Sequence, residues 1–235
     1  MLEIYYIYIA SVLPDEDKWH GLRNWISEEA YRELSHIKNE RVRFFRLVGE
    51  SLVRYVLKDR WNIAPSSYQI VRQAKGKPYL KGESELFFNI SHSGNYLVCA
   101  FSDREVGVDI EKRKEARMKV ANRFFHPVEV ENLMQEDQEG RDRLFYDLWA
   151  IKESFLKYIG TGLTRPLSSF RVSCEKGKIN LYEGEKKLSL YVEACEIDSE
   201  YACYVCSESC FKPKVQSLLL EDLLKADPKK DIVMK

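Results

Sequence analysis

Stretches of apolar residues predict three consecutive strands in the middle of the chain. One apolar run begins at residue 87 and breaks at the polar residues 91–94, and a second covers 96–101. A third short run follows and contains Asp109 and Glu111. Because residues two apart on a strand point to the same side, these two carboxylates are predicted to share one face.

Apolar residues at helical spacing predict helices on both sides of these strands. Residues 26–46 follow this spacing after Ser27, a candidate N-cap, and residues 48–61 continue it as a second helix. Residues 144–159 give the strongest helical pattern, which a Gly-Thr-Gly segment ends. The N-terminal apolar run carries Glu3 and no basic segment, so it predicts a buried strand and not a signal peptide. Further strands are predicted at 170–174, 178–181, 188–197 and 201–206, and a short helix at 218–224.

The second half of the chain repeats the first. The run Glu-Ser-Leu-Val-Arg-Tyr from Glu50 returns as Glu-Ser-Phe-Leu-Lys-Tyr from Glu153, and further matches keep their order at an offset of about 100 residues. We therefore expect an α+β fold of two similar halves related by a pseudo-twofold axis. These halves are expected at residues 1–104 and 105–225, with a frayed tail at 226–235 and the active site in the cleft between the halves.

Composition excludes several functional classes. The chain has 235 residues, is 45% hydrophobic, and carries 37 basic and 37 acidic side chains with zero net charge. These values predict a globular protein with a sizeable core and argue against a general nucleic-acid coat. No apolar run approaches the roughly 20 residues of a membrane span. A reducing, cytoplasmic compartment is expected, with six free thiols. Cys203 and Cys206 lack the second ligand pair of a zinc finger, and Cys203 is interpreted as a small apolar filler.

Three carboxylates and one lysine carry candidate chemistry. An isolated pair such as Asp109 and Glu111 is more often a solvated edge than a metal site. Glu153 lies four residues before Lys157, a spacing that most often gives a surface ion pair. The helix that holds these two residues is rich in large apolar side chains, so both are expected to be partly buried. A Mg²⁺–pyrophosphate unit would give all four residues a function.

His92 and the segment Gly76-Lys77-Pro78 each allow two interpretations. His92 is either a locally bonded turn histidine or a phosphate donor helped by Ser91. Gly76-Lys77-Pro78 is either a plain turn or an approach to a flat ligand with a lysine for an anion.

Taken together, four segments resemble the phosphopantetheinyl transferase superfamily. They are Gly76-Lys77-Pro78, Phe-Asn-Ile-Ser-His-Ser-Gly from Phe88, Val-Gly-Val-Asp-Ile-Glu from Val106, and Trp-x-x-Lys-Glu-Ser-x-x-Lys from Trp149. Their order and spacing are most similar to the monomeric surfactin-type (Sfp-type) branch. The resemblance implies transfer of the 4′-phosphopantetheine arm of coenzyme A to a serine of an apo acyl or peptidyl carrier protein, with release of 3′,5′-ADP. It also implies Mg²⁺, which Mn²⁺ can replace, and a carrier of fatty-acid, polyketide or nonribosomal-peptide synthesis.

The resemblance implies a role for each matching residue. The metal ligands would be Asp109, Glu111 and Glu153. The coenzyme A ligands would be Gly76, Lys77, Pro78, Ser91, His92 and Lys157. The catalytic residues would be Glu129, Glu153 and Lys157. Of these, Glu129 would accept the serine proton and Lys157 would stabilise the departing 3′,5′-ADP.

One departure from the family concerns the 3′-phosphate. Relatives place basic residues in the stretch 28–34, where this chain has Ala30 and Glu33. The substitutes are Arg32, Lys38, Arg43 and Arg46, together with His92.

The carrier is expected to dock on the loop after Glu111 and on Phe124-Phe125. A Mg²⁺-dependent phosphohydrolase and a non-catalytic coenzyme A or carrier-binding module are the two alternative functions.

Overall fold

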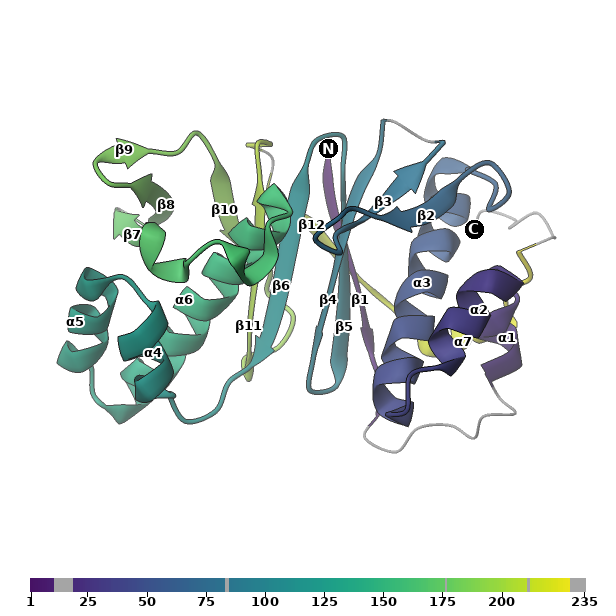
Figure 1. Ribbon diagram of the computed structural model, residues 1–235. Helices are drawn as coiled ribbons and strands as arrows, with labels where there is room; N and C mark the ends of the chain where they lie inside the picture. Colours follow the sequence, from purple (N-terminus) through teal and green to yellow (C-terminus); the bar gives the residue numbers. More distant parts are fainter. Residues whose placement is uncertain (11–18, 83–84, 176, 211, 229–235) are drawn as a thin grey trace.

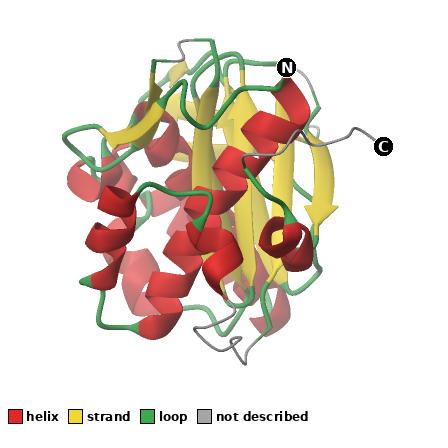
Figure 2. Ribbon diagram, turned by 90° about the vertical axis from the view of Figure 1, so that its right-hand side faces the viewer, coloured by secondary structure: helices red, strands yellow, loops and turns green. Residues whose placement is uncertain are grey.

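Two α+β halves lie side by side in the computed structural model, which describes residues 1–10, 19–82, 85–175, 177–210 and 212–228. Their sheets meet in the middle of the molecule, and helices cover the outer faces (Figures 1 and 2). The first half contains β1 (Leu2–Tyr8), α1 (His20–Arg23), α2 (Glu28–Ser35), α3 (Glu40–Trp61), β2 (Gln69–Arg72), β3 (Pro78–Lys81), β4 (Phe87–Ser93) and β5 (Tyr96–Ser102). The second half begins with β6 (Val106–Lys112), α4 (Met118–Phe124), α5 (Pro127–Gln135) and α6 (Gln138–Ile159). It continues with β7 (Arg171–Glu175), β8 (Lys178–Glu183), β9 (Lys186–Lys187), β10 (Tyr191–Ala194) and β11 (Tyr201–Ser207).

The predicted duplication is confirmed by two equivalent central helices. α3 and α6 each have 22 residues and each cover one sheet. Asn39 caps the start of α3 and Asp137 the start of α6, since each side chain accepts a hydrogen bond from a first-turn N–H. Both helices end in the left-handed region, at Asn62 (φ 55°) and Gly160 (φ 70°).

Strand β5 shows why the predicted strands read as continuous apolar runs. Leu97, Cys99 and Phe101 pack in the cluster under α3, whereas Val98 and Ala100 pack in a separate cluster between the two sheets. Both faces of β5 are therefore buried, which favours apolar residues at every position. The N-terminal run is also confirmed as a buried strand, β1.

The helix predicted over 26–46 is wrong at its C-terminal end. Ser27 does cap a helix, since its Oγ accepts from the N–H of Ala30 at 3.1 Å, but that helix, α2, ends at Ser35. Residues 40–46 belong to α3, because Asn39 starts a new helix there. The apolar spacing continues across the break, so periodicity alone did not show it.

The strand after residue 87 is longer than predicted. β4 extends through Ser93, so His92 is a strand residue and not a turn histidine. The turn is confined to Gly94 and Asn95, where Gly94 has a φ of 56° that glycine favours.

The C-terminal segment was predicted to belong to the second half, but it packs against the first half. β12 (Lys214–Leu218) pairs in parallel with β1, giving the first sheet the order β12-β1-β5-β4. α7 (Leu220–Lys225) then packs against α1 and α3. The second half therefore ends near β11, and the expected tail lies mostly outside the described residues.

Two other expectations concern thiols and membranes. All six cysteines are free, as predicted, and Cys203 is buried in the core between the sheets. Within the described residues, no helix combines the length and apolar character needed to cross a membrane.

Candidate active site

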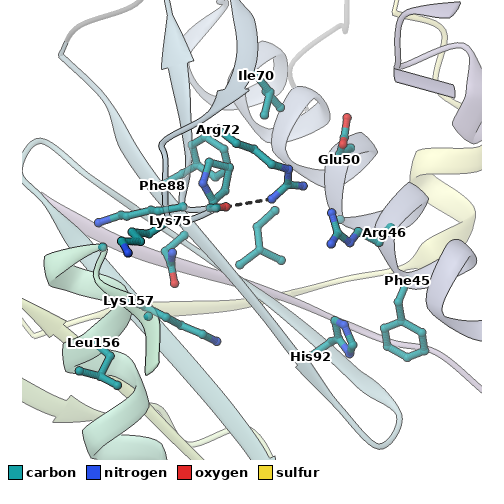
Figure 3. A pocket seen from close by; sticks show the side chains of 18 residues that line it. Phe45, Arg46, Glu50, Ile70, Arg72, Lys75, Phe88, His92, Leu156 and Lys157 are labelled. Atoms are coloured by element: carbon teal, nitrogen blue, oxygen red, sulfur yellow. Dashed lines mark hydrogen bonds between the residues drawn. The ribbon is translucent and has the colours of Figure 1, made fainter. Parts of the chain in front are cut away.

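A cavity of about 300 Å³ opens between the two halves. The first half supplies its walls from α3, the β2–β3 hairpin and β4, and the second half supplies the C-terminal end of α6. Figure 3 shows Arg46, Arg72, His92 and Lys157 around this space. The cleft predicted from the duplication is therefore present and is rich in basic groups.

The two sheets are joined beside this cleft by side chains. β4 and β6 are the edge strands of their sheets. Asn89 Oδ1, Ser91 Oγ and Ser93 Oγ accept hydrogen bonds from three alternate N–H groups of β6, at 3.0, 3.4 and 3.1 Å. Because alternate residues share one face of a strand, these three side chains of β4 bind the edge of β6 in succession. We call Asn89, Ser91 and Ser93 the polar seam.

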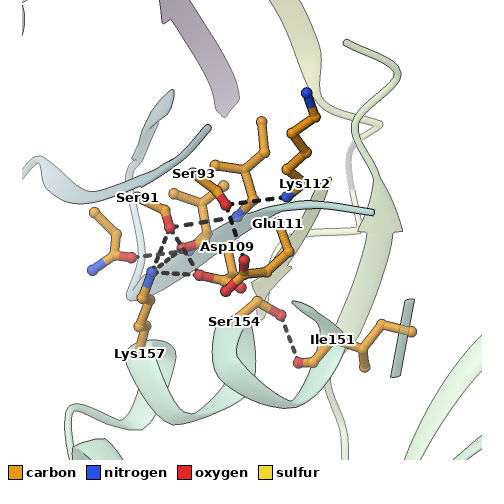
Figure 4. A network of polar contacts seen from close by, with 11 residues as sticks. Ser91, Ser93, Asp109, Glu111, Lys112, Ile151, Ser154 and Lys157 are labelled. Atoms are coloured by element: carbon orange, nitrogen blue, oxygen red, sulfur yellow. Dashed lines mark hydrogen bonds and ion pairs between the residues drawn. The ribbon is translucent and has the colours of Figure 1, made fainter. Parts of the chain in front are cut away.

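The polar seam also contacts the two carboxylates of β6 (Figure 4). Ser91 Oγ donates to Asp109 Oδ1 at 2.8 Å, and Ser93 Oγ donates to Glu111 Oε2 at 3.0 Å. The prediction that Asp109 and Glu111 share a face is confirmed by these parallel contacts. The seam therefore fixes the two carboxylates relative to each other.

Asp109 is buried and only half satisfied. Its Oδ1 accepts from Lys157 Nζ at 2.6 Å, while its Oδ2 is buried and has no hydrogen-bond partner among the residues that the structure describes. Lys157 Nζ also donates to Ser91 Oγ at 2.7 Å and to the Val108 carbonyl at 3.2 Å. Lys157 therefore pairs with Asp109 on the facing strand and not with Glu153 on its own helix.

The other two carboxylates are electrostatically coupled to Asp109. Desolvation, followed by the charge of Asp109, raises the pKa of Glu153 from 4.5 to about 7. The same two causes raise the pKa of Glu111, although its hydrogen bond from Ser93 opposes them. Three acidic groups thus share one region in which their negative charges are costly.

These residues fit a hard divalent cation in charge and donor type. Among the described residues, no three carboxylate, imidazole or thiol groups gather closely enough in this structure to enclose a metal ion. However, the unpartnered Asp109 Oδ2 and the raised pKa values of Glu111 and Glu153 are features that a bound cation would relieve. Oxygen ligands of this kind suit Mg²⁺.

Basic groups line the opposite wall of the cleft. Arg46 on α3 is exposed and makes no hydrogen bond or ion pair with another described residue. Desolvation and the charge of Lys157, together with that of Arg46, lower the pKa of His92. The imidazole is held against the Phe45 ring, with 4.9 Å between the centroids. The cleft can therefore receive an anion without first breaking an ion pair at Arg46.

Comparison with known proteins decides the family. Residues 105–206 match the model of the 4′-phosphopantetheinyl transferase superfamily, and residues 12–104 match the model of the 4′-phosphopantetheinyl transferase N-terminal region. The chain is 32% identical over 225 residues to the 4′-phosphopantetheinyl transferase Sfp of Bacillus subtilis (strain 168), covering 95% of this chain and 100% of that protein.

The chain belongs to the 4′-phosphopantetheinyl transferase superfamily, in its surfactin-type branch.

Further relatives carry the same activity in their names. The 4′-phosphopantetheinyl transferase gsp of Aneurinibacillus migulanus is 31% identical over 207 residues, covering 88% of this chain and 86% of that protein. An L-aminoadipate-semialdehyde dehydrogenase-phosphopantetheinyl transferase of Xenopus laevis is 32% identical over 185 residues, covering 71% and 61%. The protein is therefore a transferase.

Within the transferase, Gly76-Lys77-Pro78 lines the cleft, but Lys77 has its own partners. Its Nζ donates to Glu105 Oε2 at 2.5 Å and to the Tyr158 carbonyl at 2.8 Å. Lys77 therefore ties the β2–β3 hairpin to the second half, and the expected anion contact does not fit this geometry. Gly76 has a φ of 90° and open space around its Cβ position, so the turn requires its backbone freedom and not its small size.

Glu129 is not brought to the cleft. It is 1% exposed, and its Oε1 pairs with Lys152 Nζ at 2.9 Å. The two oxygens also accept from the N–H groups of Val172 at 2.7 Å and His126 at 3.0 Å. A base must reach the proton that it accepts, so the expected catalytic role of Glu129 is corrected to a structural role in the core of the second half.

Sequence reasoning missed two groups of residues in this transferase. Arg72 and Lys75 line the cleft, and Arg72 Nη1 donates to the Gly76 carbonyl at 3.1 Å (Figure 3). The alternation of β2 is the signal that could have found Arg72, since it places Arg72 on the same face as Ile70, another cleft residue. Asn89 and Ser93 belong to the segment Phe-Asn-Ile-Ser-His-Ser-Gly from Phe88. Their partners lie on another strand, β6, and no local sequence pattern indicates such a pairing.

Proposed function

We propose that this transferase moves the 4′-phosphopantetheine arm of coenzyme A to a serine hydroxyl of an acyl or peptidyl carrier protein, in a reaction that requires Mg²⁺ and releases 3′,5′-ADP. The observation that carries the proposal is the buried Asp109, whose Oδ2 has no hydrogen-bond partner among the described residues and whose charge raises the pKa values of Glu111 and Glu153. A carboxylate group of this kind next to a basic cleft suits a metal-bound pyrophosphate.

The cleft would bind coenzyme A through its charged and apolar walls. Arg46, Arg72 and Lys75 line the cavity and offer positive charge for the phosphates. Ile70 and Phe88 offer apolar surface for the adenine. Of the four substitutes expected for the 3′-phosphate, Arg46 is the one that lines this cavity, whereas Arg43 lies over the Trp19 ring. Arg46 is therefore our assignment for the 3′-phosphate, with His92 beside it.

Mg²⁺ would be held by Asp109 Oδ2, Glu111 and Glu153. When bound, it supplies charge neutralisation on the pyrophosphate. The role of the chain is to hold these carboxylates ionised and oriented, which Ser91 and Ser93 support by donating to Asp109 and Glu111.

Glu153 replaces Glu129 as our candidate for accepting the serine proton. Unlike Glu129, its side chain is only partly buried, and it lies on the same face of α6 as Lys157. Lys157 lies one turn further along α6 and lines the cleft. Its ammonium group would stabilise the charge that develops on the departing 3′,5′-ADP as the serine oxygen attacks phosphorus.

The carrier would approach from the side of α4. Phe124 is 42% exposed, whereas Phe125 is buried against Phe145 and Trp149. Phe124 alone can therefore contact a partner, which narrows the expected docking pair to one residue, together with the loop after Glu111.

Intact-protein mass spectrometry tests the proposal. An apo carrier protein is incubated with the transferase, coenzyme A and Mg²⁺, with a parallel sample in EDTA. We expect a metal-dependent gain of one phosphopantetheine arm on the carrier, and we expect Asp109→Asn to abolish it. Asp103→Asn is the matched control, because Asp103 is an exposed aspartate on the loop between β5 and β6 that pairs with the N-terminus.

Three results would contradict the proposal. Cleavage of coenzyme A without modification of the carrier would favour a phosphohydrolase. Full transfer by Asp109→Asn, or full transfer in EDTA, would refute the assignment of the metal ligands.

A further inference from the structure

The tip of the β4–β5 hairpin reaches from the first half to the second. Its residues Gly94 and Asn95 meet Tyr201, the first residue of β11. The Asn95 N–H donates to the Tyr201 hydroxyl at 3.2 Å. A Cβ on Gly94 would lie 2.4 Å from the same oxygen, so the hydroxyl and the hairpin tip are in close contact. The Tyr201 hydroxyl therefore contacts both residues of the tip.

Tyr201 is itself firmly held. The Tyr96 ring packs edge-on against it with 4.8 Å between centroids, and the Lys112 ammonium lies 5.9 Å from the ring centre. The hairpin tip is also held by the first half, since Arg41 Nη2 donates to the Gly94 carbonyl at 2.8 Å and to Asn95 Oδ1 at 3.0 Å. The tip is thus clamped between an arginine of the first half and a tyrosine of the second.

The clamp lies next to the last residue of the polar seam. Ser93 ends β4 and directly precedes Gly94. Its Oγ accepts from the Lys112 N–H at 3.1 Å and donates to Glu111 Oε2 at 3.0 Å (Figure 4). Ser93 pairs with Tyr96 across the two-residue turn, so it is the residue of β4 nearest to the clamped tip. The position of Ser93, and with it the orientation of Glu111, depends on the clamped tip.

We infer that Tyr201 is a positioning residue for Glu111, acting through Ser93. The inference rests on the proposed function, because it matters for metal binding only if Glu111 is a metal ligand. Partners that orient metal ligands typically change metal affinity by roughly 10- to 100-fold when they are removed. Tyr201 lies one step further away than Ser93, so its effect should be the smaller of the two.

Tyr201→Phe is the test variant, because it removes the hydroxyl and keeps the ring. Tyr96→Phe is the matched control, since its hydroxyl bonds Asp198 Oδ2 at 3.1 Å and not the hairpin tip. The readout is Mn²⁺ affinity, measured by electron paramagnetic resonance in the presence of coenzyme A and without a carrier. We expect Tyr201→Phe to weaken Mn²⁺ binding by about 3- to 10-fold and Ser93→Ala by about 10-fold or more, with Tyr96→Phe unchanged.

The double variant Tyr201→Phe/Ser93→Ala shows whether Tyr201 acts through Ser93. If it does, the double variant should bind Mn²⁺ no more weakly than Ser93→Ala alone. Gly94→Ala supplies a second perturbation of the clamp, because its Cβ would displace the Tyr201 hydroxyl, and it should weaken Mn²⁺ binding as well. The KM for coenzyme A should stay within twofold in Tyr201→Phe, since Tyr201 does not line the cleft.

The outcomes separate the inference from the proposed function. If Asp109→Asn loses Mn²⁺ while Tyr201→Phe binds it like Tyr96→Phe, the clamp has no effect on the metal site and the inference is overturned. Additive losses in the double variant would overturn the route through Ser93. Unchanged Mn²⁺ binding by Asp109→Asn would instead refute the metal assignment on which both depend.

Discussion

Glu129→Gln distinguishes a structural role of Glu129 from a catalytic one. The substitution keeps the shape of the side chain but removes the charge that faces Lys152. The Lys152 ammonium would stay fully buried, with the carbonyls of Leu167 and Phe170 as acceptors at 2.9 and 2.8 Å and with the Phe170 ring 4.3 Å away. Removing one partner of a buried ion pair costs about 3–5 kcal/mol. The remaining carbonyl contacts favour the lower end of this range.

The backbone donors add to this cost. The two Glu129 oxygens accept hydrogen bonds from the N–H groups of Val172 and His126. A glutamine has only one acceptor oxygen for these two N–H groups. One of these donors would lose its partner, at roughly 1 kcal/mol. We therefore expect Glu129→Gln to lower the free energy of unfolding by about 4 kcal/mol and the melting temperature by about 10 °C.

Urea unfolding and the transfer assay should be measured on the same preparations. Glu131→Gln is the control, because Glu131 is an exposed glutamate on the same helix, α5. At 20 °C, where the folded form still dominates, kcat of Glu129→Gln should stay within about threefold of the unsubstituted enzyme. Adding Lys152→Met should recover part of the lost stability, because it removes the unpaired charge at similar volume. Unchanged stability together with a 100-fold lower kcat would refute the structural role and return Glu129 to the chemistry.

Three further predictions concern α6 and its contact with β6. Folding raises the pKa of Glu153 from 4.5 to about 7. Its contribution to stability is therefore complete below pH 4.5 and is lost as the pH rises through 7, and in EDTA the loss is at most about 3 kcal/mol. Urea unfolding of Glu153→Gln should lack this loss, and an identical pH dependence of the two proteins would contradict the prediction. Lys157→Met should lower kcat by about 100-fold or more in the mass-spectrometric assay, and a loss below threefold would exclude it from transition-state stabilisation. Gly107→Ala should lower the melting temperature by several degrees, since its Cβ would lie 2.1 Å from the Ser154 carbonyl oxygen; a shift below 2 °C would show that α6 moves aside freely.

Local sequence patterns predicted the features that depend on local geometry. Alternation placed Asp109 and Glu111 on one face, and a strand needs no distant partner to define its two faces. The N-cap of α2 at Ser27 and the end of α6 at Gly160 both follow from the local preferences of single residues. The repeated Glu-Ser motif revealed two halves because each copy lies in the long central helix of its own half.

Features set by distant partners could not be predicted in this way. The i,i+4 spacing suggested that Lys157 pairs with Glu153, but Asp109 lies 48 positions away in sequence and takes the ammonium instead. A spacing rule for one helix contains no information about a carboxylate on a facing strand. The return of β12 to the first sheet is another such case, because its partner β1 lies at the opposite end of the chain.

The polar seam explains why the carboxylates lie where the two halves meet. An exposed sheet edge leaves unpaired N–H groups, which in β6 would otherwise face another edge strand, β4. Side-chain oxygens of β4 accept hydrogen bonds from these N–H groups in place of backbone carbonyls. The hydroxyl hydrogens of the two serines stay available and are donated to Asp109 and Glu111. Each serine can therefore join the halves and hold an acidic side chain with the same atom. A continuous backbone ladder would satisfy the edges equally well, but it would leave no hydroxyl to orient Asp109 and Glu111 beside the cleft.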